Sequence, residues 1–370
     1  MLEHDFTGPP FTIGVEEELM ILDADGLDLA QRIEAVLAAV PEELEGQVKP
    51  ELMQSVLEVA TKPCPDVRTA GEQLSVLRSE VAAIGERLGL LIGASGTHPF
   101  ARWEDQAIVE RQRYRELIDE LRYVARQELI FGTHVHVAIS GPNKAIYVAD
   151  GLRRYIPVLL ALSANSPLWR GEVTGVMSTR TPVFRAFPRV GVPPHYGSWE
   201  IYSRRVELMM ENGAIDDYTY LWWDVRPHPN LGTVETRVFD QQTRLEHTVG
   251  LTALTAAIAH RLSALFDREE PMVEYPTELI DDNKVRAAIR GIEGPLIDFR
   301  GGGQVPADEM VRRMCDELAE HAEELGCAAE LAGVRDLIAN GTGARRQLRM
   351  YERSGDAREL VREIADHTRP

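Results

Sequence analysis

Residues 11–19 read Phe-Thr-Ile-Gly-Val-Glu-Glu-Glu-Leu, an apolar run that ends in three consecutive carboxylates. A strand sends alternate side chains to opposite faces, so the apolar residues share one face and Glu16 and Glu18 share the other. Glu17 has the apolar parity, and we expect a structural role for it. Three adjacent carboxylates repel one another in a strand. Either this end of the strand is solvated or a cation compensates its charge.

A second acidic pair lies between Pro50 and Pro63. Residues 49–61 place Glu51 and Glu58 seven positions apart, in a segment too short and too β-branched for a comfortable helix. We therefore predict a tight bend around residues 53–55, with Glu58 on the return strand close to Glu51.

Two further strands carry polar side chains on one face. The segment at 132–138 puts His134 and His136 together, and the segment at 232–240 puts Glu235 beside Arg237. Taken singly, these are partly exposed histidines and a surface ion pair of little energetic worth. Four strands that each present acid or imidazole on one face favour a different interpretation, in which they converge around divalent cations.

The chemistry of the side chains selects the cation. Carboxylate oxygens dominate and no cysteine lies in these segments, so Mg²⁺ or Mn²⁺ is preferred over zinc. Mg²⁺ is usually bound together with substrate phosphates, which indicates a nucleoside triphosphate substrate. The sequence contains no GxxxxGK[ST] motif, which excludes a P-loop enzyme.

The order of the elements predicts an α+β fold rather than a regular βαβ alternation. We expect strands at 11–22, 56–61, 90–96, 131–140, 220–226 and 233–240. We expect helices at 29–40, 67–88, 104–122, 144–163, 248–266, 285–292, 308–325 and 356–366, with a break or kink at Pro157. The whole chain, 1–370, is then one catalytic domain, with a sheet-bearing core at 1–245 and a mostly helical part at 246–370 packed on it.

Composition bounds the class of protein. The 370 residues are 44% hydrophobic and 27% charged, which suits a globular core, and the net charge of −19 disfavours nucleic acid and anionic membranes as partners. Three widely spaced cysteines suit reduced thiols. The N-terminal residues do not resemble a signal peptide, and no apolar run is long enough to span a bilayer. We expect a soluble, cytoplasmic protein.

Six motifs, in order along nearly the whole chain, resemble the carboxylate–amine ligases of the glutamate–cysteine ligase type 2 family. They are GVEEEL at 14–19, the paired glutamates of PELMQSVLEVAT, GTHVHV at 132–137, LALSANSPLWRGEVTGVMSTR at 160–180, WWDVRPHPNLGTVETRVFD at 222–240 and GTGARRQ at 341–347. That family is similar in fold to glutamine synthetase. The resemblance implies a curved antiparallel sheet forming a funnel, with ATP entering one end and the amino acid the other.

The resemblance also implies the metal ligands. One metal is implied at Glu18, Glu51 and Glu58. The other is implied at Glu16, His134 and Glu235, and the assignments of Glu16 and Glu18 can be exchanged between the two.

Further roles follow from the chemistry that the resemblance implies. His136 is expected to face the phosphates of ATP, and Arg226 and Arg237 to bind them and stabilise the transferred phosphoryl group. Arg180 is expected to bind a substrate carboxylate. Asn165 and Ser166 either line the amino-acid pocket or cap the preceding helix.

The activity implied is an ATP-dependent joining of a carboxylate to an amine through an acyl phosphate, with glutamate and cysteine as the substrates. The family also suggests a homodimer. Two other functions stay open: a metal-dependent amidohydrolase, because H-x-H is a zinc pair in that class, and a non-catalytic relative that binds nucleotide or amino acid.

Overall fold

The computed structural model describes residues 1–370, and its centre is a seven-stranded sheet in which every neighbouring pair is antiparallel. The strand order is β10-β11-β5-β1-β3-β2, and β4 pairs with the far end of β1. The strands are β1 (Ile13–Asp23), β2 (Val48–Pro50), β3 (Val56–Ala60), β4 (Leu90–Gly93), β5 (Gly132–Ala138), β10 (Val225–His228) and β11 (Thr233–Asp240). The predicted α+β class with a central antiparallel sheet is confirmed.

Strand β1 is central, and its register decides which polar side chains meet. Glu16 lies opposite His134 of β5, and Glu18 lies opposite Glu58 of β3. On the next pair along the sheet, Glu235 of β11 lies opposite His136. Val15 and Leu19 are fully buried, as the predicted alternation requires. The register therefore gathers the acidic and imidazole side chains on one face of the sheet.

The bend predicted after Pro50 is present. Strands β2 and β3 form an antiparallel pair in which Lys49 lies opposite Glu58, with the turn at residues 54–55. A chain that reverses within so few residues brings Glu51 back beside Glu58.

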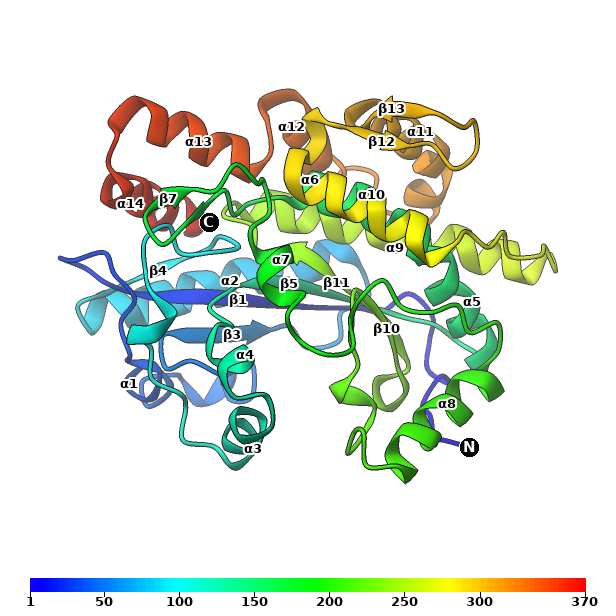
Figure 1. Ribbon diagram of the computed structural model, residues 1–370, viewed down its shortest axis with the longest axis horizontal. Helices are drawn as coiled ribbons and strands as arrows, with labels where there is room; N and C mark the ends of the chain where they lie inside the picture. The colour runs from blue at the N-terminus through cyan, green and yellow to red at the C-terminus, as the bar shows by residue number, and fades with distance from the viewer.

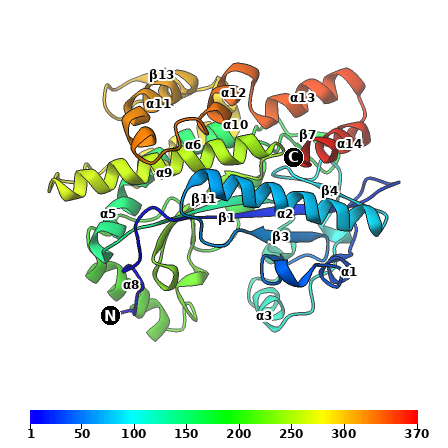
Figure 2. The ribbon, with the colours of Figure 1, turned by 180° about the vertical axis from the view of Figure 1, so that it is seen from behind.

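Helices cover the face of the sheet opposite to the one that carries the acidic and imidazole side chains. Helices α2 (Val67–Arg87) and α9 (Leu245–Asp267) pack against each other and against strands β1 and β5, as Figure 2 shows from behind. In Figure 1 the C-terminal helices form a further layer above α9. They are α10 (Thr277–Arg290), α11 (Ala307–Glu324), α12 (Ala332–Asn340), α13 (Gly343–Ser354) and α14 (Ala357–Thr368).

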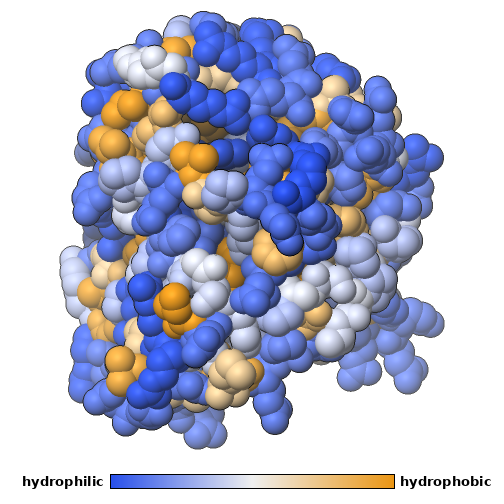
Figure 3. All heavy atoms as spheres, turned by 90° about the vertical axis from the view of Figure 1, so that its right-hand side faces the viewer, coloured by the Kyte–Doolittle hydropathy of each residue, from blue (hydrophilic) through white to orange (hydrophobic).

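The main hydrophobic core lies between the sheet and these helices. It includes Val15, Val135 and Val234 from the strands and most of the apolar residues of α9. Helix α9 is long and apolar enough to cross a membrane, but 67% of its most apolar stretch is buried inside the protein. Burial against the sheet accounts for its composition. The face drawn in Figure 3 is mostly hydrophilic, with hydrophobic side chains in scattered groups.

Some predicted helices are shorter than expected. Helix α1 spans only Ile33–Leu37, and the helix predicted from residue 104 begins at Gln112 as α3 (Gln112–Leu121), which α4 (Tyr123–Arg126) follows. The predicted break near Pro157 is confirmed. The chain passes from α5 (Pro142–Leu152) through a 3₁₀ turn into α6 (Ile156–Ser163), because proline cannot continue the hydrogen-bond ladder of α5.

The strand predicted at 220–226 is two strands. Strand β9 (Trp222–Trp223) pairs in parallel with β8 (Val190–Gly191), outside the main sheet, and only β10 joins β11. The hairpin of β12 (Pro295–Ile297) and β13 (Gln304–Pro306) interrupts the helical C-terminal part. The division of the chain at residue 245 stays a prediction.

Helix α8 (Trp199–Glu211) was not predicted, although its start carries a signal. The Ser198 hydroxyl accepts a hydrogen bond from the backbone N–H of Ile201 at 3.3 Å, which is an ordinary N-cap. The remaining short elements are β6 (Leu168–Trp169), β7 (Glu172–Val173) and α7 (Arg180–Phe184).

Candidate active site

A pocket of about 360 Å³ opens on the sheet face that α2 and α9 leave uncovered. Strands β1, β3, β5 and β11 form its floor, and helix α3 and the segment before β10 form its walls. Its charged and imidazole-bearing lining residues are Glu16, Glu18, Glu51, Glu58, Arg113, Glu128, His134, Arg180, Arg226, His228 and Arg237. Sequence segments more than 200 residues apart therefore converge on one cavity. A larger cavity, of about 480 Å³, lies between the start of α9 and helices α13 and α14, and it holds no such carboxylate cluster.

One group of potential metal ligands is Glu16, His136 and Glu235, whose ligand atoms all lie within 4.8 Å of one another. The Nε2 atom of His136 is 3.8 Å from a Glu16 oxygen and 3.7 Å from a Glu235 oxygen. The predicted group had His134 in place of His136. The register favours His136 in this group, because it sets His136 opposite Glu235 whereas His134 is directed at Glu16 and Glu18.

Glu18, Glu51 and Glu58, which the resemblance implies as ligands of one metal, lie in the same pocket. Glu18 lies opposite Glu58 across the β1–β3 pair and accepts a hydrogen bond from the backbone N–H of Gly132. Burial and the neighbouring Glu18 raise the pKa of Glu51 to about 7. Burial, Glu16 and Glu51 raise the pKa of Glu58 well above its usual value. Lys49 pairs with Glu58 at 3.3 Å, but one ammonium group does not balance three carboxylates.

Orphaned imidazole nitrogens show that divalent cations fit between these groups. The Nε2 atoms of His134 and His136 are buried and have no hydrogen-bond partner. Each faces carboxylate oxygens at 3.7–4.0 Å, which is too long for a hydrogen bond and suits two ligands of one cation. A cation at each group would also remove the repulsion among the glutamates.

Arginines also line the pocket and contact its acidic groups. Burial opposes ionisation of Glu235, but Arg226 and Arg237 hold the pKa of its carboxyl well below the usual value. Arg226 donates from Nε to Glu235 at 2.8 Å, and its Nη1 donates to the carbonyls of Thr219 and Leu221. The Nε atoms of Arg180 and Arg237 are buried and unpartnered, so these two guanidinium groups can still donate to an anion.

The sequence of this chain has close counterparts. Residues 12–363 match the model of the family described as "Glutamate-cysteine ligase family 2". The chain belongs to this family. Among curated relatives, "Putative glutamate--cysteine ligase 2-1" of Rubrobacter xylanophilus is 46% identical over 97% of this chain and 95% of its own. "Putative glutamate--cysteine ligase 2" of Sorangium cellulosum is 41% identical over 97% of this chain and 96% of its own.

Two solved structures share the fold of this family-2 ligase. A glutamate–cysteine ligase from Francisella tularensis, in complex with AMP, superposes with a TM-score of 0.71 at 14% identity and covers 99% of this chain and 90% of its own. A bifunctional glutathione synthetase from Pasteurella multocida gives 0.70 at 17% identity, over 97% of this chain and 52% of its own. At such low identity these matches establish the fold of the ligase and no more.

Asn165 and Ser166 of the ligase are absent from the lining of this pocket, which disfavours the first of the two roles expected for them. Both are fully buried, and the Asn165 N–H and the Ser166 hydroxyl donate to Asp240 at 2.8 and 2.7 Å. The Ser166 hydroxyl also accepts from the backbone N–H of Arg180 at 3.1 Å. These residues therefore hold the segment that carries Arg180.

The GTGARRQ motif of the ligase packs against the same loop. Gln347 donates from Nε2 to the backbone carbonyl and side-chain oxygens of Asn165, at 2.9 and 2.8 Å. A Cβ at Gly343 would lie 2.0 Å from the Asn165 side-chain oxygen, so only glycine fits there. This motif has a structural role.

Several pocket residues of the ligase were missed from sequence. The pocket is also lined by Glu128, just after α4, by Arg113 of α3 and by His228 at the end of β10. No hydrophobic periodicity in the sequence marks these three positions. Burial raises the pKa of Glu128 to about 8 and lowers that of His228 to about 4. Trp222 also lines the pocket and packs edge-on against Phe187, with ring centroids 5.5 Å apart.

The raised pKa values predict how the stability of the metal-free ligase depends on pH. Glu51, Glu58 and Glu128 have folded pKa values above their unfolded values, so the folded state holds more protons and its advantage is lost as pH rises. We expect the free energy of unfolding in EDTA to fall between about pH 6.5 and 8, where unfolded carboxylates are already ionised. Urea titrations at several pH values measure this slope.

Mg²⁺ should oppose this fall in stability with rising pH, because it competes with protons for the same carboxylates. We expect the stabilisation by Mg²⁺ to grow over the same pH range and the EDTA slope to flatten in Glu51→Gln. A metal-free protein whose stability rises over this range would contradict the assignment of these carboxylates.

Proposed function

We propose that this chain is an ATP-dependent carboxylate–amine ligase that joins the γ-carboxylate of glutamate to the amine of cysteine through an acyl phosphate. One observation carries the proposal: Glu16, Glu18, Glu51, Glu58 and His134 line one pocket together with arginines, and His136 and Glu235 lie directly beside them. This arrangement brings cation-binding and anion-binding groups into one pocket, with Arg226 and Arg237 in contact with Glu235.

The chemistry requires both sets of groups. A carboxylate does not react with an amine at neutral pH, so the γ-phosphoryl group of ATP is first transferred to it, and the amine then displaces phosphate. The carboxylate groups would hold Mg²⁺ or Mn²⁺, which would supply positive charge to neutralise the charge that develops during this transfer.

The acidic groups hold the cations and fix their positions. Glu18, Glu51 and Glu58 form one ligand set, and Glu16, His136 and Glu235 form the other. His134 bridges the two sets, because its Nδ1 is 3.3 Å from Glu16 and its Nε2 is 4.0 Å from Glu18. The Nδ1 atom of His136 lies 3.0 Å from the Thr233 hydroxyl, so we assign His136 a ligand role through Nε2 rather than a phosphate contact.

The arginines divide their tasks. Arg237 and Arg180 retain unpartnered Nε atoms, so we assign Arg237 to the transferred phosphoryl group and Arg180 to the carboxylate of the amino acid. Arg226 uses its donors on Glu235 and two backbone carbonyls, so we assign to it the orientation of Glu235 beside the nucleotide. This differs from a direct phosphate contact for Arg226.

The identity of the two substrates is the most specific part of the proposal. Glutamate and cysteine come from the names of the relatives and of the matching family. The pocket supports an acidic donor, because Arg180 and Arg113 add cationic groups beyond those that the phosphoryl transfer uses. Its aromatic wall of Phe184, Phe187 and Trp222 suits a small uncharged acceptor side chain.

We also propose that the enzyme works in the cytoplasm, where ATP and reduced thiols are held. Cys64, Cys315 and Cys327 are all free in the structure, in keeping with a reducing compartment. Its partners are then small amino acids and nucleotide. The homodimer suggested by resemblance remains a prediction.

The test is a screen of amino-acid pairs for ADP release, with product detection by mass. We expect ADP formation to need both a carboxylate donor and an amine, with glutamate and cysteine the fastest pair. Glutamate labelled with ¹⁸O in its γ-carboxylate should transfer one labelled oxygen to the released phosphate, which only an acyl phosphate explains.

The same experiment separates the other functions. A metal-dependent amidohydrolase would cleave amides without nucleotide, and a non-catalytic relative would bind ATP without releasing ADP. Either result, or phosphate without label, would overturn the proposal.

A further inference from the structure

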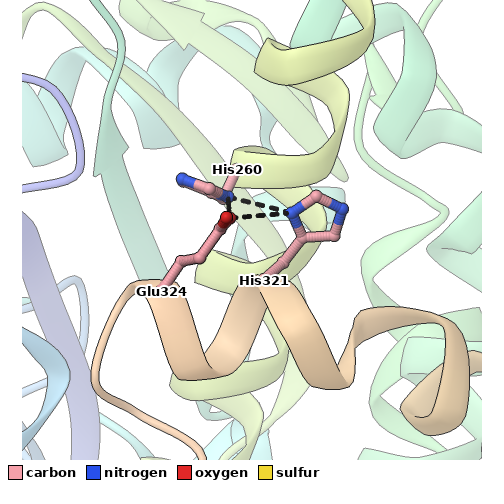
Figure 4. Close-up of side chains that lie close together, drawn as sticks. All are labelled: His260, His321 and Glu324. Atoms are coloured by element: carbon pink, nitrogen blue, oxygen red, sulfur yellow. Dashed lines mark hydrogen bonds and ion pairs between the residues drawn. The ribbon is translucent and has the colours of Figure 1, made fainter.

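Three side chains with metal-binding atoms converge far from the active-site pocket, between helices α9 and α11. His260 comes from α9, and His321 and Glu324 come from α11, where a spacing of three residues puts them on one face. Figure 4 shows the two imidazole rings and the carboxylate turned toward a common point. None of the three contributes to the active-site pocket.

The distances within this cluster match those between ligands of one small cation. The Nδ1 atoms of His260 and His321 are 3.0 Å apart, and a Glu324 oxygen lies 3.5 Å from the first and 3.6 Å from the second. A point equidistant from all three atoms lies about 2.0 Å from each, which is the length of Zn–N and Zn–O bonds.

Hydrogen bonding alone explains this arrangement poorly. One imidazole proton can serve the contact between the two rings, but the two contacts to Glu324 are at the edge of hydrogen-bonding range. Phe11, just before β1, packs against the His260 ring with centroids 4.8 Å apart and limits its rotation. The rings are thus held with three ligand atoms facing one point.

The cluster is also accessible and suited to a cation. The side chains of His260 and His321 are 20% and 17% exposed, so an ion can enter from solvent. Burial and the neighbouring His321 lower the pKa of His260, which favours the neutral ring that binds metal.

We propose that His260, His321 and Glu324 bind one Zn²⁺ ion, with water as the fourth ligand. Two imidazoles and one carboxylate form a common zinc ligand set, whereas Mg²⁺ prefers oxygen ligands and an octahedral shell. The ion would link α9, which covers the sheet, to the outer helix α11. Its effect would therefore be on stability rather than on the chemistry of the pocket.

The experiment uses the full-length protein, stripped of metal with EDTA and loaded with Zn²⁺ in excess Mg²⁺ so that the carboxylate pocket is occupied. After gel filtration, we expect the wild type to retain one equivalent of zinc more than His321→Ala. We also expect zinc to raise the Tm of the wild type by about 5 °C and to leave that of His321→Ala unchanged.

Two variants keep the result interpretable. Glu324→Gln changes an exposed side chain and should fold normally, yet it should weaken zinc retention. His367→Ala is the matched control, because His367 also pairs with a glutamate one helical turn away, Glu363, but belongs to no group of three potential metal ligands. It should retain zinc like the wild type. Equal zinc content in the wild type, His321→Ala and Glu324→Gln would overturn the proposal.

Discussion

Glu58→Gln is expected to abolish ATP-dependent amide formation while leaving the fold intact. Glutamine has the shape of glutamate without its charge, and Glu58 is already held toward its neutral form by burial, Glu16 and Glu51. The metal-free variant should therefore be as stable as the wild type, or slightly more stable. Loss of a residue that only orients a metal ligand reduces metal affinity or activity by about 10–100-fold, so loss of a ligand should reduce kcat/KM by at least about 100-fold.

The measurement combines ADP release with Mg²⁺-dependent stabilisation. Wild-type protein should gain thermal stability with Mg²⁺, and Glu58→Gln should gain much less. Glu45→Gln, an exposed glutamate in the loop before β2, is the control and should match the wild type in both assays. Wild-type turnover in Glu58→Gln would reject Glu58 as a metal ligand.

The comparison with Glu235→Gln is informative because the charges that surround the two glutamates have opposite signs. Glu58 faces other carboxylates, whereas Glu235 is the only anion in direct contact with both Arg226 and Arg237. Glu235→Gln should therefore lose activity and also stability, since two buried cations lose their partner.

Strand parity and spacing predicted much of this site. Parity alone placed Glu16 and Glu18 on one face, His134 and His136 on one face, and Glu235 beside Arg237. The spacing of Glu51 and Glu58 predicted the bend that returns one to the other. These inferences succeeded because a two-residue period and a short turn are local properties of the chain.

Features that depend on register or tertiary approach could not be predicted. Parity cannot tell whether His134 or His136 lies opposite Glu235, because that depends on how β5 and β11 align across a bulge. Glu128 and Arg113 lie on segments that reach the pocket only through packing of α3 and α4. Asn165 lies in a segment that suits a pocket loop, yet Gly343 and Gln347, distant in sequence, enclose it.

Arg78→Met is expected to destabilise the fold more than any of the active-site substitutions. Arg78 and Glu17 are both fully buried, and Arg78 donates from Nε and Nη2 to the two Glu17 oxygens at 2.8 and 2.6 Å. Burial opposes ionisation of Glu17, but Arg78 holds the pKa of its carboxyl below the usual value. Removing one partner of a buried pair costs about 3–5 kcal/mol, because the other charge stays buried without compensation.

The guanidinium of Arg78 also joins parts of the chain that are distant in sequence. It donates to the carbonyls of Gln242 and Thr243, before α9, and to that of Thr368, at the end of α14. Arg78→Met should therefore loosen the C-terminal helix as well as the pair itself. Urea unfolding followed by circular dichroism measures the total loss, and hydrogen exchange of α14 measures its local part.

A double-mutant cycle separates the charge effect from these carbonyl contacts. In Glu17→Leu/Arg78→Met no buried charge is left unpaired, so it should recover part of the loss seen in Arg78→Met, while the carbonyls that Arg78 served stay unsatisfied. Additive losses would show that the pair is not coupled.

Glu17 and Glu18 are adjacent, so Glu18→Gln is the natural comparison. The Glu18 side chain points to the other face, and the variant should lose activity with little change in stability. The opposite responses of two neighbouring glutamates would follow directly from the alternation of β1, since one face of that strand supports the core and the other supports the reaction.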